Sequence, residues 1–280
     1  MRTRGLFLLA VILIVVGVGV ALYRGAGPLP NPAGCTADVA GRHVELATDQ
    51  AENATLIAAI GVRRGLPARA VSIALATAFQ ESKMRNLPGG DRDSVGIFQQ
   101  RPSQGWGTRA QLRDRSYAIN AFYDALQKVH GYQSMRITDA AQQVQRSGFP
   151  DAYEAHALDA RALASALTGY SPGGRFSCVV HASSRHGTAR AVEASLRHGY
   201  GAGLAVHRTG VRQDLVVQLP RTAAGYRLGW SVAQYLVAQA GRLHIADVRF
   251  AGRHWSAGSS SKGWVRSGPG SRTRVSVSLG

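Results

Sequence analysis

The sequence predicts an α+β protein with three consecutive parts: an apolar N-terminal segment, a mainly α-helical middle part and a small α+β module. Three observations support this prediction. An uncharged run lies near the N-terminus, apolar residues recur at helical spacing from about 45 to 178, and the pattern becomes strand-like after about 185. The chain has 280 residues, which suffices for about two domains of ordinary size.

Residues 1–24 predict a membrane anchor. Between Arg4 and Arg24 lie 19 uncharged residues, and a helix of that length just spans a hydrocarbon core of about 30 Å. Arg2 and Arg4 precede the run, so the rest of the chain is expected outside the cytoplasm. A cleaved signal peptide is the alternative, although the residues at 22–24 spoil its small-x-small site. The protein is therefore expected to be a single-pass membrane protein facing the cell wall, or secreted if the segment is cleaved.

Residues 25–44 are expected to form a linker, because GAGPLPNPAG at 25–34 is rich in Pro and Gly. Cys35 and Cys178 are the only cysteines and bracket the helical part. Two lone cysteines in an oxidising compartment are expected to pair. A bridge that closes so long a loop stabilises the fold by about 4–5 kcal/mol on the chain-entropy model. Two free thiols are the alternative.

The middle part, residues 45–180, is expected to be one helical domain. Its helices are predicted from apolar spacing at 49–64, 68–81, 115–130, 138–147 and 151–169. Pro67 suits the first turn of the second helix. Residues 86–96 are rich in turn formers, and 97–100 is a short extended piece at most.

The C-terminal module, residues 185–280, is expected to be a small basic α+β domain. Strands are predicted at 203–207, 215–219, 243–250 and 274–279, with a helix at 228–240. Residues 184–280 hold 14 basic and 3 acidic residues, and so carry +11 of the net charge of +17. Such a surface attracts polyanions, among which anionic wall polymers fit an exported protein. A charge that serves solubility alone is the alternative.

Glu81 closes the apolar helix AVSIALATAFQES. A carboxyl group in apolar surroundings has a raised pKa, because its charged form loses more hydration than its neutral form. A carboxyl that stays protonated near neutral pH can donate to a glycosidic oxygen, which is what glycoside cleavage requires. A solvated carboxylate is the alternative interpretation of a lone Glu at a helix end.

The pair Glu81-Ser82 is followed by the segment GIFQ at 96–99. In this order they resemble the lysozyme-like soluble lytic transglycosylases, in which a Glu-Ser pair ends a buried helix and a Gly-hydrophobic-hydrophobic-Gln segment follows. The stretch DSVGIFQQRPSQGWGT at 93–108 is similar to an actinobacterial branch of that superfamily. The run VQRSGFPDAY at 144–153 is similar to its later helix-turn-helix element.

The resemblance covers roughly residues 45–170. It implies a lysozyme-like fold and an enzyme, either a lytic transglycosylase or a lysozyme-type glycosidase, that cleaves the glycan strands of peptidoglycan without a cofactor. Glu81 would be the general acid and then the base. Ser82 would fix Glu81 or the substrate, and Gln99 would line the cleft and contact the sugar.

Three further residues are candidate substrate contacts. Tyr153 lies where the family often places a tyrosine near the catalytic carboxyl, although the usual Ala-Tyr-Asn ends here in Glu154. Trp106 is a sugar-stacking platform or, alternatively, a core residue. Asp93 would be the second carboxylate of a hydrolase, or a turn residue of a Gly-rich loop. A lytic transglycosylase needs only one Glu, so both outcomes stay open and the single-Glu mechanism is slightly favoured.

Two other functions compete with glycan cleavage. His207, Asp214 and His254 resemble part of a zinc peptidase motif, but Arg253 stands where that family has its catalytic Glu beside His254. No metal is therefore expected, and the module is interpreted as a binding domain. A catalytically inactive wall-binding or scaffold protein with a lysozyme-like fold is the main alternative. Nucleic-acid binding is not expected, because the chain is exported and lacks a nucleic-acid motif.

Overall fold

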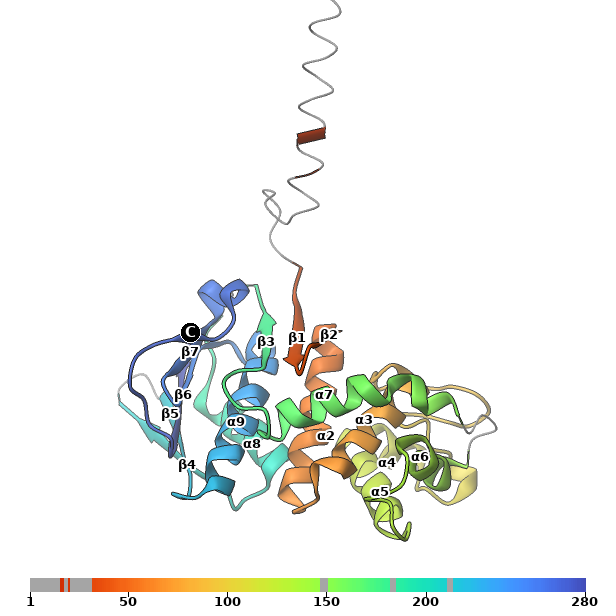
Figure 1. Ribbon diagram of the computed structural model, residues 1–280. Helices are drawn as coiled ribbons and strands as arrows, with labels where there is room; N and C mark the ends of the chain where they lie inside the picture. Colours follow the sequence, from red (N-terminus) through yellow and green to blue (C-terminus); the bar gives the residue numbers. More distant parts are fainter. Residues whose placement is uncertain (1–15, 18–19, 21–31, 147–150, 182–184, 211–213) are drawn as a thin grey trace, which may run out of the picture. The chain divides into compact units, whose positions relative to one another are not determined.

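The computed structural model describes residues 16–17, 20, 32–146, 151–181, 185–210 and 214–280 (Figure 1). The chain divides into two compact units, Met1–Pro32 and Ala33–Gly280. Most of the predicted anchor at 1–24 lies outside the described residues. Within the described part of the chain, no helix combines the length and the hydropathy that crossing a membrane requires.

A small antiparallel sheet joins the start of the second unit to its middle. It consists of β1 (Gly34–Val39), β2 (Arg42–Leu46) and β3 (Phe176–Val179), in the order β2-β1-β3. The linker expected at 25–44 thus contains all of β1 and the start of β2. The sequence did not predict these strands, because they are short and because the central strand, β1, pairs with a strand far along the chain, β3.

Cys35 on β1 lies directly opposite Cys178 on β3. The two form a disulfide across 143 residues, and both side chains are buried. The predicted pairing is confirmed. The bridge closes the entire helical part into one covalent loop.

The helical part surrounds the central helix α3 (Ala68–Ser82), which packs against α2, α5, α6, α7 and the 3₁₀ helix η2. Small side chains at Ala70, Ala74 and Ala78 are fully buried and let these neighbours approach closely. The other elements are α2 (Thr48–Arg63), η1 (Pro102–Gln104), α4 (Arg109–Arg113), α5 (Arg115–Gln127), α6 (Ile137–Gln145), η2 (Ala152–His156) and α7 (Ala157–Leu167).

The C-terminal part is a six-stranded antiparallel sheet covered by a buried helix, α9 (Ala223–Ala238), which contacts β6 and β9. The strand order is β4-β5-β9-β6-β7-β8. The bounds are α8 (Ala189–Tyr200), β4 (Ala205–Thr209), β5 (Asp214–Gln218), α10 (Ala240–Leu243), β6 (Ile245–Phe250), β7 (Arg253–Ser256), η3 (Ala257–Lys262), β8 (Val265–Arg266) and β9 (Arg274–Leu279). The α+β class is confirmed, with two antiparallel sheets.

Helix α8 was not expected, because the Ser- and Gly-containing segment before it indicated a boundary. Part of that segment is the start of the helix. Thr188 is the N-cap, and its hydroxyl accepts a hydrogen bond from the backbone N–H of Ala191 at 3.3 Å.

The helical part and the C-terminal part share one core. Helix α2 packs against α3, α5 and α7, and also against α8 and α9. Gln234 of α9 is fully buried; its amide donates to the carbonyl of Ala166 at 2.7 Å and accepts from the N–H of Phe176 at 3.0 Å. Residues 33–280 form one compact unit, which includes the predicted boundary between 180 and 185.

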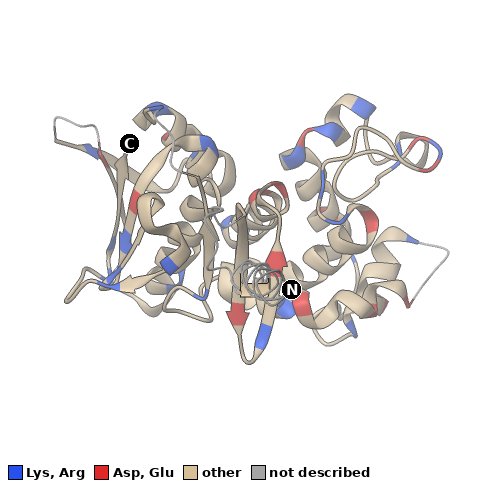
Figure 2. Ribbon diagram, turned by 90° about the horizontal axis from the view of Figure 1, so that it is seen from above, with Lys and Arg blue, Asp and Glu red and all other residues tan. Residues whose placement is uncertain are grey.

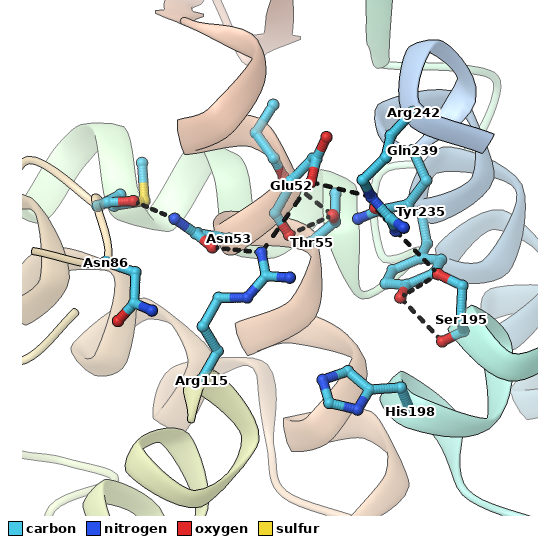
Figure 3. Close-up of polar contacts among 12 residues, drawn as sticks. Glu52, Asn53, Thr55, Asn86, Arg115, Ser195, His198, Tyr235, Gln239 and Arg242 are labelled. Carbon is cyan, nitrogen blue, oxygen red and sulfur yellow. Dashed lines mark hydrogen bonds and ion pairs between the residues drawn. The ribbon is translucent and has the colours of Figure 1, made fainter. Parts of the chain in front are cut away.

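A polar network centred on Glu52 ties α2 to helices on both sides (Figure 3). The side chain of Glu52 is 14% exposed, and its carboxylate lies 3.3 Å from Nε of Arg242 and 4.0 Å from Nη1 of Arg115. Arg242 also donates to Oγ of Ser195 at 3.3 Å, and the hydroxyl of Tyr235 donates to the Ser195 carbonyl at 2.9 Å. This network adds directional contacts between α2, α5, α8, α9 and α10.

Candidate active site

Glu81 lies in the last turn of α3, where the apolar helix meets the surface. The helix ends at once, because Lys83 and Met84 both take left-handed backbone conformations, with φ of 53° and 56°. The side chain of Glu81 is therefore part-buried between the helix end and the segments that cross it.

Two neutral groups hold the Glu81 carboxylate. The hydroxyl of Tyr153, a fully buried residue of η2, donates to Oε1 at 2.7 Å. The side chain of Gln145, the last residue of α6, gives a second hydrogen bond. Its Nε2 also donates to the Phe98 carbonyl at 2.7 Å, which fixes the orientation of the amide. Within the described residues, no Lys, Arg or His forms an ion pair with Glu81.

Burial dominates the ionisation of this carboxyl. Loss of hydration raises the pKa of Glu81, and the hydrogen bonds from Tyr153 and Gln145 lower it, with a net rise. A cation at this place would have reversed the result, since an opposite charge favours the carboxylate. The surroundings thus favour a group that keeps its proton longer than an ordinary glutamate does.

Ser82 is buried and serves the framework of the site. Its hydroxyl donates to the carbonyl of Ile97 at 2.6 Å and accepts from the N–H of Arg85 at 3.1 Å. It therefore pins the segment 96–99 against the end of α3. The bonds given for Ser82 are to backbone groups, and its roles in fixing Glu81 or the substrate stay predictions.

Gln99 is folded into its own loop. Its Oε1 accepts from the Ser94 hydroxyl at 2.9 Å, and its Nε2 donates to the Gly96 carbonyl at 3.0 Å. A Cβ atom at Gly90 would lie 1.6 Å from Oε1 of Gln99, so this packing requires glycine at position 90. The side chain is part-exposed, and contact with a substrate would need one of these loop bonds to open.

Asp93 is also hydrogen-bonded within its own loop. Its carboxylate accepts from Nε of Arg101 at 2.7 Å and from the N–H of Ser103 at 2.8 Å. These bonds hold the pKa of Asp93 far below its usual range, with the Ser103 N–H as the largest cause. The turn interpretation accounts for this residue, and the contacts give it no link to Glu81.

Trp106 is part-buried and packs against the core, which agrees with the core alternative. Its carbonyl accepts from the hydroxyl of Tyr117 at 3.2 Å. Gly107 follows with φ of 132°, and a Cβ atom there would lie 2.5 Å from that hydroxyl. The loop around Trp106 therefore packs closely against α5.

Sequence reasoning missed Gln145 and His156. Gln145 lies inside the stretch 144–153 that resembles the family, so its signal was present but was not singled out. The ring of His156 stacks on Phe79 with centroids 5.4 Å apart, and its Nε2 lies 3.2 Å from Oε1 of Gln80. Burial lowers the pKa of His156, which keeps this neighbour of the site uncharged near neutral pH.

The suspected zinc motif is not assembled. His207 lies on β4 and His254 on β7, with β5, β9 and β6 between them. His254 instead hydrogen-bonds Asp247 on the neighbouring strand β6. No three His, Cys, Asp or Glu side chains of the described part gather in a way that could hold a metal ion.

A hollow of about 770 Å³, which Glu81 does not line, is formed by residues 169–172 with residues 220–227 and 272–273. Residues 159–275 match the family model "VldE, C-terminal domain", which is what this part of the chain is similar to. The match covers less than half of the chain, begins inside α7 and leaves Glu81 outside. The search of curated proteins found no match.

Proposed function

We propose that this chain cleaves the glycan strands of peptidoglycan, with Glu81 as general acid and then as general base. The observation that carries the proposal is a part-buried carboxyl with a raised pKa that has hydrogen-bond donors and, among the described residues, no ion pair with a cation. A carboxyl with these properties can deliver a proton to a glycosidic oxygen near neutral pH.

The neighbours of Glu81 suit both halves of such a cycle. When the proton leaves for the glycosidic oxygen, the carboxylate is stabilised by the Tyr153 hydroxyl and the Gln145 amide, both already in place. The same carboxylate can then take a proton from water or from the C6 hydroxyl of the sugar. Ser82 and Gln145 both bond the segment 96–99, so they keep its loop against the acid.

The contacts of Asp93 favour the single-carboxylate mechanism. A hydrolase needs a second carboxylate with freedom to attack or to activate water. Asp93 is engaged by Arg101 and Ser103. We therefore propose the lytic transglycosylase outcome, with anhydro sugar ends as products.

The disulfide supports an extracytoplasmic site of action. Disulfides persist in oxidising compartments and are rare in the cytosol, and Cys35–Cys178 is buried between paired strands. We propose that the chain works on the wall side of the membrane, held by residues 1–24 or released after their cleavage.

A catalytically inactive wall-binding or scaffold protein is the second candidate. One observation favours it: the side chain of Gln99 is held by its own loop. Under this hypothesis the burial of Glu81 is a remnant of an ancestral site.

Glu81→Gln separates the two candidates, because it keeps size and hydrogen bonding but removes the acid. Muropeptide release from purified sacculi is expected to fall at least about 10²-fold, the usual contribution of a general acid. The matched control is Glu154→Gln, which removes an exposed carboxylate of η2 near Tyr153 and is expected to keep most activity. Mass spectrometry of the products distinguishes anhydro ends from reducing ends. Unchanged release by Glu81→Gln would leave only the second candidate.

A further inference from the structure

Four hollows, three lined mainly by the C-terminal part and one lined mainly by residues 36–38 and 172–177, adjoin one another. The first, of about 770 Å³, and the second, of about 740 Å³, share Arg221 and Thr273. The second and the third, of about 540 Å³, share Arg274 and the backbone turn at 269–271. The third meets a fourth, of about 300 Å³, at Arg253. We call this series of neighbouring hollows the arginine track.

Seven arginines and one carboxylate, that of Asp38, line the track among the described residues. Asp38 lies at the far end, in the fourth hollow, where its Oδ1 is 2.6 Å from Nδ1 of His43. The track therefore presents one sign of charge along most of its length. Hollows lined by one sign of charge concentrate counter-ions more strongly than a flat surface does.

The track arginines lack carboxylate partners within the structure. The described carboxylates that pair with arginines of residues 185–280 are Glu193, with Arg208, and Glu52, with Arg242, and neither arginine lines the track. Figure 2 shows how sparse acidic residues are in the C-terminal part. An ionic partner for the track must therefore come from outside the described chain.

Two tyrosine rings lie in the first hollow beside its arginines. The guanidinium of Arg227 lies 4.9 Å from the ring centroid of Tyr170, and that of Arg272 lies 4.3 Å from the ring centroid of Tyr226. Stacking on a ring orients each guanidinium and leaves its N–H groups for an anion. Tyr170 is 57% exposed, so it also offers apolar ring surface to a bound molecule.

We propose that the arginine track binds an acidic glycopolymer, a polysaccharide chain that carries phosphate or carboxylate groups at intervals. Arginine forks match both anions with paired hydrogen bonds. Neighbouring hollows share lining residues, so one chain ligand can contact several of them, and the tyrosine rings suit sugar faces. The proposal does not rest on Glu81, because the track and the glutamate have no residue in common.

The compartment argues for a sugar polymer over a nucleic acid. The disulfide favours an oxidising compartment, where the proposed wall-side location would expose the track to wall polymers. A membrane surface is also less suitable, since the arginines line hollows instead of projecting from a convex face.

The test compares two double variants of the full chain that change the net charge equally. Arg221→Gln with Arg274→Gln removes the two arginines shared between adjoining hollows. Arg190→Gln with Arg197→Gln removes two exposed arginines of α8 that line none of the four. The probes are polygalacturonate for carboxylate, phosphomannan for phosphate and dextran as a neutral polymer. Binding is measured by titration calorimetry at low and at physiological ionic strength.

We expect at least one acidic polymer to bind and dextran not to bind. The track variant should lose about tenfold in affinity, equivalent to about one well-placed ionic hydrogen bond, and show a weaker salt dependence. The α8 variant should change affinity less than about twofold. The acidic polymer that binds more tightly identifies the anion. Equal losses in the two variants, or no binding of either acidic polymer, would overturn the proposal.

Two further measurements keep the test decisive. Duplex DNA and phosphatidylglycerol vesicles are titrated at matched charge. If either one binds more tightly than the acidic polymers and loses the same affinity in the track variant, that molecule and not the sugar polymer is the ligand. Arg272→Gln serves as a second track variant if the double variant does not fold. Its loss of affinity should exceed that of Arg190→Gln, and an equal loss would count against the track.

Discussion

Glu81 and Glu52 are two glutamates of the same helical part with opposite surroundings. Glu52 lies on α2 between the guanidinium groups of Arg115 and Arg242. Glu81 lies at the end of α3, with a tyrosine hydroxyl and an amide as its partners. Both side chains are part-buried, so burial alone does not distinguish them.

The comparison shows that the partner decides the role of a buried carboxyl. Two arginines pair with Glu52 and connect its helix to two others, as Figure 3 shows. Neutral donors orient Glu81 without cancelling the effect of its burial, and its pKa stays raised. The first arrangement stabilises the fold, whereas the second holds a proton that can be given away.

The largest expected effect concerns both glutamates at once, because both lie in the loop that the disulfide closes. Replacing Cys35 and Cys178 together with Ser should lower the free energy of unfolding by about 4–5 kcal/mol. Urea unfolding followed by circular dichroism measures the change. Reduction of the wild-type protein should give a similar loss, and the same reductant should not affect the variant. A stable reduced protein would mean that the shared core alone holds both sites.

The next effect separates the two glutamates. Glu52→Gln removes the charge that Arg115 and Arg242 share, and should cost about 2–3 kcal/mol of unfolding free energy. Glu81→Gln leaves no cation unpaired and should keep or raise the stability at pH 7. Thermal unfolding of the two variants side by side checks the opposite signs. Similar losses from both would show that Glu81 is also a structural joint.

The stability difference for Glu81 should depend on pH. Its pKa is raised in the folded state, so the folded protein binds the proton more tightly than the unfolded chain does. Ionisation therefore costs folding free energy as the pH rises from the unfolded pKa through the folded pKa. The advantage of Glu81→Gln should be present at pH 7 and vanish below about pH 4, where both states are protonated.

The smallest effect tests the hydrogen bond that orients the acid. Tyr153→Phe removes a donor to the carboxylate, so the pKa of Glu81 should rise further. The basic limb of the pH profile of glycan cleavage should move to higher pH, while the rate at the optimum should fall less than about tenfold. Tyr123→Phe is the control, because its hydroxyl bonds the Ile57 carbonyl in the core. A basic limb that stays in place would separate Tyr153 from the acid.

Much of the helical part was predictable from local pattern. The predicted helices at 49–64 and 68–81 agree with α2 and α3 to within one residue at each end. The predicted helix at 151–169 is divided into η2 and α7, and the predicted helix at 228–240 starts five residues earlier, at Ala223. Helical spacing reports which face is buried, but it reports less well where a helix begins.

The candidate site was predictable in its acid and less so in its surroundings. Glu81 stood out because a charged residue closes a long apolar run, and its raised pKa was expected from that position. The sequence could not predict that Gln99 and Asp93 are hydrogen-bonded within their own loop. Their bonds to Ser94, Gly96 and Ser103 form only in the folded loop.

The sequence by itself determined the helices at 49–64 and 68–81, the place of Glu81 at a helix end and the pairing of the only two cysteines, because these follow from residues close in the chain or from simple counting. Only the tertiary structure decided that residues 33–280 form one compact unit and that arginines from 175 to 274 line one track. Both depend on contacts between segments distant in sequence, such as Gln234 with Ala166 and Phe176. Local spacing carries no information about which distant backbone groups a buried side chain will reach.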